Sequence, residues 1–116
     1  MNFLNMSEKE ILAIATPIMD NLMQASTDID HAKHVQDFTE RAKAIVTKEH
    51  LARVCTKYQS EKGTWGKREP IAVLRRPDSA AIIFKQLCSK VEGEYVAEIV
   101  LVHQDDRFLV DHAMVC

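Results

Sequence analysis

The chain has 116 residues, of which 47% are hydrophobic and 28% are charged, and its formal net charge is −2. This length suits one domain and this composition excludes a disordered chain, so we expect residues 1–116 to form a single domain. The charge balance gives no strongly basic surface, and we therefore expect no nucleic-acid partner.

The N-terminus lacks a basic stretch followed by a long apolar run, and no later run is long enough to cross a membrane. We therefore expect a cytoplasmic protein with no membrane partner. Cys55, Cys88 and Cys116 show no paired ligand spacing, so we expect reduced thiols, no metal and no cofactor. His31 and His34 have a spacing that can share a metal, but no third ligand is evident, and we expect both on a solvated face.

The first half of the chain has the apolar spacing of helices. Ser7 and Glu10 form a capping-box pattern that predicts a helix start, which leaves residues 1–6 as a loose N-terminal extension. Apolar residues then recur at helical spacing up to Met23. Pro17 within this run predicts a bend, because proline removes one intrahelical hydrogen bond.

Helical spacing resumes after a break at residues 26–30, which are rich in capping side chains. One segment runs to Ile45, and another begins with Thr47 as its cap and ends at Gly63. The pattern leaves open whether these two segments are separate helices.

Beyond Gly63 the apolar period changes to two, which predicts four strands at roughly 65–75, 79–90, 94–103 and 107–115. The connecting turns are too short for parallel crossovers, so the strands form an antiparallel meander in sequence order. The predicted fold class is α+β, with N-terminal helices packed on a four-stranded antiparallel sheet.

Two-residue hairpin loops give a register in which Glu69 faces Gln86 and Ile99 faces His112. One side of the sheet then carries most of the aromatic residues, and we expect the helices to cover it. Glu69, Gln86 and His112 fall in one row on this covered side. Asp111 points the other way from His112, so these two residues are not expected to form a dyad.

The opposite side of the sheet, the outer face, is also largely apolar, although no further helix remains to cover it. An apolar surface of this kind is typical of an association surface. We predict that two copies pair through the outer face, at Ile83, Leu87, Val96, Val100, Val102, Leu109 and Val115. The alternative is that the last helical segment covers this face.

The covered side holds the polar residues most able to serve a site. A partly desolvated His112 beside Glu69 or Gln86 is a candidate general base or ligand contact. The alternative for His112 is a core histidine that bonds to the backbone or to water. The alternative for Glu69, which we favour, is a salt bridge with Lys67 or Arg68 at the rim. Three aromatic residues that combine a ring with a hydrogen-bond donor are candidates for lining a pocket: Tyr58, Trp65 and Tyr95. Plain packing is the alternative for each of these.

Two stretches carry a resemblance to a known family. Residues 51–69 (LARVCTKYQSEKGTWGKRE) end a helix at a glycine and lead directly into the first long strand, and residues 94–116 (EYVAEIVLVHQDDRFLVDHAMVC) form the last hairpin around a short acidic turn. With helices first and a curved sheet second, the chain resembles a short branch of the nuclear-transport-factor-two-like superfamily of cystatin-like, cone-shaped domains. This resemblance implies a pocket between the helices and the concave sheet face, and a dimer through the outer face.

Two functional hypotheses follow. The first is a non-catalytic homodimer that binds a small, mostly apolar molecule between its helices and its sheet. The second is a small acid–base enzyme, such as an isomerase, cyclase or hydrolase, that uses His112. We favour the first, because no convergent pair of acid–base groups is evident. A domain that binds another protein through its outer face is a third alternative.

Overall fold

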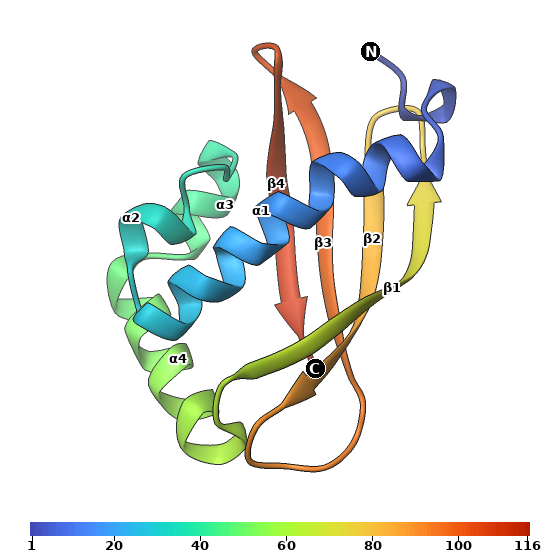
Figure 1. Ribbon diagram of the computed structural model, residues 1–116. Helices are drawn as coiled ribbons and strands as arrows, with labels where there is room; N and C mark the ends of the chain where they lie inside the picture. The colour runs from blue at the N-terminus through green and yellow to red at the C-terminus, as the bar shows by residue number, and fades with distance from the viewer.

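The computed structural model describes residues 1–116 as a layer of helices packed on one antiparallel sheet (Figure 1). The helical elements are the 3-10 turn η1 (Phe3–Asn5), α1 (Glu8–Asp28), α2 (His31–His34), α3 (Glu40–Ile45) and α4 (Lys48–Lys62). The strands are β1 (Trp65–Arg75), β2 (Ala80–Cys88), β3 (Tyr95–Gln104) and β4 (Arg107–Val115). Neighbouring strands are antiparallel in the order β1-β2-β3-β4. The predicted α+β fold class and the meander are therefore confirmed.

Local capping fixes where α1 begins and ends. Ser7 Oγ accepts a hydrogen bond of 3.1 Å from the N–H of Glu10, whose carboxylate accepts one of 3.0 Å from the N–H of Ser7. These reciprocal bonds satisfy two backbone donors at the helix start and confirm the predicted capping box. α1 continues through Pro17 and ends where Ile29 adopts a left-handed conformation, with φ of 51°.

The two later helical segments are separate. Thr47 caps α4, because its hydroxyl accepts a 3.2 Å hydrogen bond from the N–H of His50. The segment before it is divided into α2 and α3, joined by residues 35–39. In this connection Phe38 pairs with Val110 of β4, and the N–H of Thr39 donates to the carbonyl of Val110 over 2.9 Å. Pairing with the free edge of β4 thus interrupts what reads in the sequence as one helix.

The helices lie on one side of the sheet. α1 crosses the strands diagonally, and α2, α3 and α4 gather beside β4 (Figure 1). The face that α1 covers is the inner face. Large, fully buried apolar side chains join α1 to β2, β3 and β4, and they include Ile11, Met19, Ile82, Ile99, Leu101 and Val110.

A register shift in β1 changes the predicted pairing of its polar residues. The pairing skips Ile71 between Pro70 and Ala72, at a point where Pro70 has no N–H to donate to β2. Arg68 therefore faces Gln86, and Glu69 lies on the outer face. The predicted pairing of Glu69 with Gln86 is wrong, because that register assumed no bulge.

A second shift interrupts the pairing of β3 with β4. It falls between Val100 and Leu101 of β3 and leaves Asp111 of β4 as an extra residue. The Asp111 carboxylate accepts hydrogen bonds from the hydroxyl of Thr39, over 2.8 Å, and from the guanidinium of Arg41. Contacts with α3 and its cap thus hold the bulge.

The bulge reverses the faces of the last residues of β4. His112 pairs with Val100 rather than with Ile99, so His112 lies on the outer face and its predicted place on the covered side is wrong. Val115 pairs with Ala97 and packs against the core, so Val115 belongs to the inner face and not to the predicted dimer surface. One extra residue accounts for both corrections, because strand side chains alternate.

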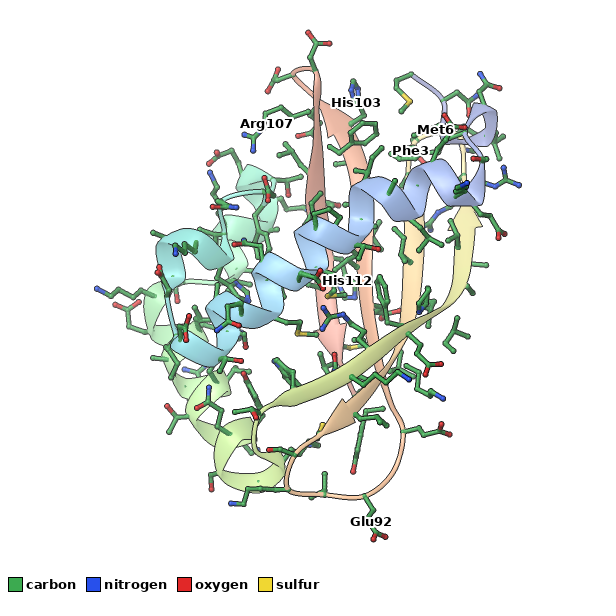
Figure 2. The ribbon with its side chains drawn as sticks, in the orientation of Figure 1. Phe3, Met6, Glu92, His103, Arg107 and His112 are labelled. Atoms are coloured by element: carbon green, nitrogen blue, oxygen red, sulfur yellow. The ribbon has the colours of Figure 1, made fainter.

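The N-terminal residues are packed rather than loose, contrary to expectation. Phe3 is 1% exposed, and its ring centroid lies 5.9 Å from that of Phe108. The carbonyl of Met6 accepts a 2.7 Å hydrogen bond from Arg75. Figure 2 shows Phe3 and Met6 beside the ends of β1 and β2. The apolar ring of Phe3 explains the packing, because it closes this end of the core.

None of the helices combines the length with the apolar character that crossing a membrane requires.

Candidate functional site

A cavity of about 350 Å³ lies between the helices and β4. All four α-helices, β4 and the start of β1 contribute to its lining, which is mostly hydrophobic. The buried apolar side chains that line it are Leu22, Met23, Phe38, Ala42, Leu51 and Cys55. Exposed apolar side chains at its mouth are Ile45, Val54 and Met114. Small-molecule sites typically enclose about 300–1,000 Å³, so this cavity is at the lower end of that range.

One wall of the cavity is a stacked aromatic pair. The rings of Tyr58 on α4 and Trp65 on β1 have centroids 4.3 Å apart and an interplanar angle of 19°. The hydroxyl of Tyr58 lies 2.7 Å from Ser26 Oγ, which in turn lies 3.3 Å from Cys55 Sγ. Burial raises the pKa of the Cys55 thiol, which disfavours the nucleophilic thiolate. The hydrogen bonds that join Tyr58, Ser26 and Cys55 hold the aromatic wall in place.

Two ring nitrogens of the lining residues are buried and have no hydrogen-bond partner: His34 Nδ1 and Trp65 Nε1. His34 is 9% exposed, and its ring packs edge-on against Phe38 with centroids 5.3 Å apart. Burial, assisted by the neighbouring charge of His31, lowers the pKa of His34 to about 4. His34 is therefore a neutral side chain at pH 7. Its predicted place on a solvated helix face is wrong, because α2 turns it toward the cavity.

An ion pair lies at the edge of the cavity. Arg41 on α3 and Asp111 in the β4 bulge approach to 2.9 Å, and both line the cavity. The hydrogen bonds from Arg41 hold the pKa of Asp111 below its usual range, and the hydroxyl of Thr39 assists them. Each charge already has its counterion, so this pair fixes the bulge and leaves the cavity mainly apolar.

Gln86 is on the inner face, as predicted, but its amide is already fully engaged. Its Nε2 donates to the carbonyls of Gly66 and Leu87, over 3.0 and 2.8 Å, and its Oε1 accepts from Arg68 over 3.1 Å. Gln86 is completely buried and is not among the residues of the cavity. These bonds satisfy the backbone where β1 leaves regular pairing.

Glu69 and His112 lie on the outer face, away from Gln86. Glu69 forms ion pairs with Lys67 at 3.3 Å and Lys85 at 3.7 Å. His112 Nε2 lies 3.3 Å from Glu98 Oε1, and Figure 2 marks its position along β4. His112 borders the cavity at the strand edge, but its imidazole contacts Glu98 instead of a pocket carboxylate. The row of three polar residues predicted on the covered side is therefore absent.

The predicted aromatic residues divide between two places. Tyr58 and Trp65 line the cavity. Tyr95 does not; its hydroxyl donates to the carbonyl of Glu92 over 3.2 Å, in the loop marked in Figure 2. Apart from Tyr58, the residues of the helices that line the cavity, above all His34 and Ser26, were not predicted from the sequence. No sequence signal marks these two residues as cavity-lining, because their place depends on the path of the chain beside β4.

No family model matches the sequence, and no curated protein matches it. Solved structures do match the fold. An NTF2-like protein of unknown function from Methylobacillus flagellatus is 9% identical, with a TM-score of 0.59 over 99% of this chain and 97% of that chain. A putative calcium/calmodulin-dependent protein kinase type II association domain from Thiobacillus denitrificans is 10% identical, with a TM-score of 0.60 over 86% of this chain and 91% of that chain.

Bd1075 of Bdellovibrio bacteriovorus is 13% identical with a TM-score of 0.55, and the match covers 95% of this chain. This chain spans only 42% of the length of Bd1075. At these identities the likeness concerns the fold alone. The chain has the nuclear-transport-factor-two-like fold, as its sequence pattern suggested.

Proposed function

We propose that this protein is a small dimeric binding domain whose helix–sheet cavity takes a small, mostly apolar molecule. The observation that carries the proposal is the cavity itself: about 350 Å³, lined mainly by apolar side chains from all four α-helices and β4. Removing apolar surface from water is the dominant favourable contribution to binding in such a site. The aromatic wall of Tyr58 and Trp65 adds a flat, rigid surface.

The arrangement of titratable groups favours binding over acid–base catalysis. His34 is neutral and buried, Arg41 and Asp111 neutralise each other, and Cys55 has a raised pKa. The acid–base alternative required His112 beside Glu69 or Gln86. His112 instead contacts Glu98. No general acid and base are therefore placed opposite each other across the cavity.

The dimer is proposed to form through the outer face. The side chains there are apolar and partly or fully accessible along β2, β3 and β4: Ile83, Leu87, Val96, Val100, Val102 and Met114. Leu109 lies on the same face and is 8% exposed. Exposed apolar patches of this kind mark association surfaces.

Charges on the outer face support a second copy of this chain as the occupant. Lys85 contacts Glu94 at 2.9 Å, and His112 contacts Glu98 at 3.3 Å. A two-fold interface places one patch against itself, so a face that carries both signs of charge can pair with its own copy. Its charged groups already have partners within the chain, which lowers the cost of removing them from water.

The three thiols support a cytoplasmic location, which we also propose. Cys55, Cys88 and Cys116 are all unpaired, as is usual for proteins of a reducing compartment.

Titration with a bicyclic hydrocarbon, 2-isopropenylnaphthalene, tests the binding proposal. Binding is measured from backbone amide shifts in NMR spectra. Wild-type protein should bind one molecule saturably, with the largest shifts in α4 and β4. Ala42→Leu fills the cavity from α3 and should weaken binding about tenfold, because overfilling a packed site costs about 1–3 kcal/mol.

The matched control is Ala44→Leu, at an exposed residue of α3 that does not line the cavity. This variant should bind as the wild type does. Absence of saturable shifts, or equal weakening by both substitutions, contradicts the binding proposal.

A further inference from the structure

Two ring nitrogens of residues that line the cavity have no hydrogen-bond partner, and this restricts the chemistry of a ligand there. Buried polar groups in proteins almost always have a hydrogen-bond partner, because leaving one unpaired forfeits its interaction with water without replacement. In this chain the unpaired buried side-chain nitrogens and oxygens are His34 Nδ1 and Trp65 Nε1. Both residues line the same cavity, although they come from α2 and β1. Neither nitrogen receives a hydrogen-bond partner from the chain itself.

The chemistry of each nitrogen restricts what that partner is. An indole Nε1 is a donor only, so Trp65 requires an acceptor. A neutral histidine has one donor and one acceptor nitrogen, so His34 Nδ1 is a hydrogen-bond donor in one tautomer and an acceptor in the other. Neither ring has freedom to turn elsewhere: Trp65 is stacked on Tyr58, and His34 is packed against Phe38.

The charges around the cavity favour a partner without positive charge. Arg41 is paired with Asp111 at 2.9 Å. Lys62 also lines the cavity, has no carboxylate partner, and has its Nζ 5.7 Å from the centre of the Tyr95 ring. A cationic ligand would meet this unpaired charge, whereas an oxygen acceptor would not be repelled.

We propose that the cavity recognises an apolar molecule that carries a neutral oxygen acceptor, of the carbonyl type, which accepts a hydrogen bond from Trp65 Nε1. A second polar group on the molecule pairs with His34 Nδ1. The apolar walls provide affinity, and the two nitrogens make a pure hydrocarbon bind more weakly than a ligand with an acceptor, because a hydrocarbon leaves both unpaired. This inference rests on the proposed binding function and specifies the class of ligand.

Two probes of the same shape test the acceptor: 2-acetylnaphthalene and 2-isopropenylnaphthalene, which differ by an oxygen in place of a methylene carbon. Wild-type protein should bind the ketone about tenfold more tightly than the hydrocarbon, as expected when a buried donor gains its partner. Trp65 is the single tryptophan, so its indole N–H gives one NMR resonance. That resonance should move downfield with the ketone and not with the hydrocarbon.

Substitution identifies the donor. Trp65→Phe keeps an aromatic ring against Tyr58 but removes the N–H, and it should abolish the preference for the ketone while hydrocarbon binding persists. Tyr95→Phe is the control, because the Tyr95 hydroxyl donates to Glu92 outside the cavity, and it should keep the preference. His34→Phe should leave the preference for this single-acceptor probe intact.

The outcomes separate this inference from the function on which it rests. Equal binding of both probes with an unmoved indole resonance overturns the acceptor proposal and leaves the binding function standing. A ketone preference that survives Trp65→Phe also overturns it. Failure of both probes to bind wild-type protein overturns the binding function and the acceptor proposal together.

Discussion

His34 couples the stability of the protein to pH. Burial lowers its pKa to about 4 from the usual 6.5. The folded state therefore resists a proton that the unfolded chain accepts, and stability falls as the pH drops from 6.5 toward 4. The full effect is on the order of 3 kcal/mol, since each unit of pKa corresponds to about 1.4 kcal/mol.

Urea denaturation of wild-type protein and of His34→Leu between pH 7.5 and 4.5 measures this contribution. The free energy of unfolding of the variant should fall less steeply over this range than that of the wild type. Parallel curves for the two proteins would mean that His34 is accessible to protons in the folded state.

Asp111 also makes the stability fall as the pH drops, but over a more acidic range than His34. Its pKa is held below the usual 3.8, chiefly by hydrogen bonds from Arg41. Its stabilisation is thus complete above pH 3.8 and is lost as the pH falls through the lower folded-state pKa. The ion pair is partly exposed, so we expect Asp111→Asn to cost only about 1 kcal/mol at pH 7.

The control for this substitution is Asp106→Asn, in the exposed β3–β4 turn, where φ is 59° and asparagine is well tolerated. This control should be close to neutral. A difference between Asp111→Asn and wild-type protein that stays constant down to pH 2.5 would argue against the assigned pKa shift.

At the scale of elements, the sequence predicted those features that depend on local signals. The capping box of Ser7, the cap of Thr47 and the stop at Gly63 all follow from neighbouring residues, and all are present. The division of the second segment into α2 and α3 was not predictable in this way. It depends on Phe38 and Thr39 pairing with β4, which lies far along the chain.

The faces of the strands were predictable only where the pairing has no bulge. Alternation placed Gln86 and Ile99 on the inner face correctly, because β2 and β3 pair without interruption. It failed beyond Asp111, which the alternation pattern does not mark as an extra residue. The side chain that explains this bulge is Arg41, 70 residues earlier.

The same limits decided how well the site was predicted. Trp65 was identified from its residue type, because a large ring with one donor suits a pocket wall. His112 was predicted on the wrong face, because the one extra residue at the bulge shifts its pairing by one position. His34 resembles a solvated histidine in the sequence, and its burial follows only from the path of α2 beside β4.

Gly63 is the junction between α4 and β1. Its φ of 84° is unfavourable for other residues, and a Cβ there would collide with Ser89 Oγ and lie 2.9 Å from Lys90 Cγ. Gly63→Ala should therefore cost on the order of 1–3 kcal/mol. Gly93→Ala shares a positive φ, of 109°, but its nearest contact would be an ordinary 3.8 Å, so it should cost less.

Urea denaturation of both glycine variants measures this difference. Equal losses would show that backbone conformation alone, and not crowding at the junction, determines the cost.

At the scale of the whole molecule, the outer face should hold two copies together. Val100 lies within this face, opposite His112. A charge at Val100 would be buried without a partner in the dimer, so Val100→Asp should convert a dimer to a monomer. Sedimentation at micromolar concentration measures the mass.

Leu4→Asp adds the same charge at an exposed apolar residue of η1, outside the strands of the sheet. This control should sediment as the wild type does. A wild-type protein that is monomeric at micromolar concentration would contradict the dimer.

The most direct test of the binding cavity is a measurement of nuclear Overhauser contacts between 2-isopropenylnaphthalene and methyl groups of the protein. We expect contacts to the methyl groups of Leu51 and Val115, which line the cavity from α4 and β4. Contacts confined to Val96 and Val100 would place the probe on the outer face and rule out binding in the cavity.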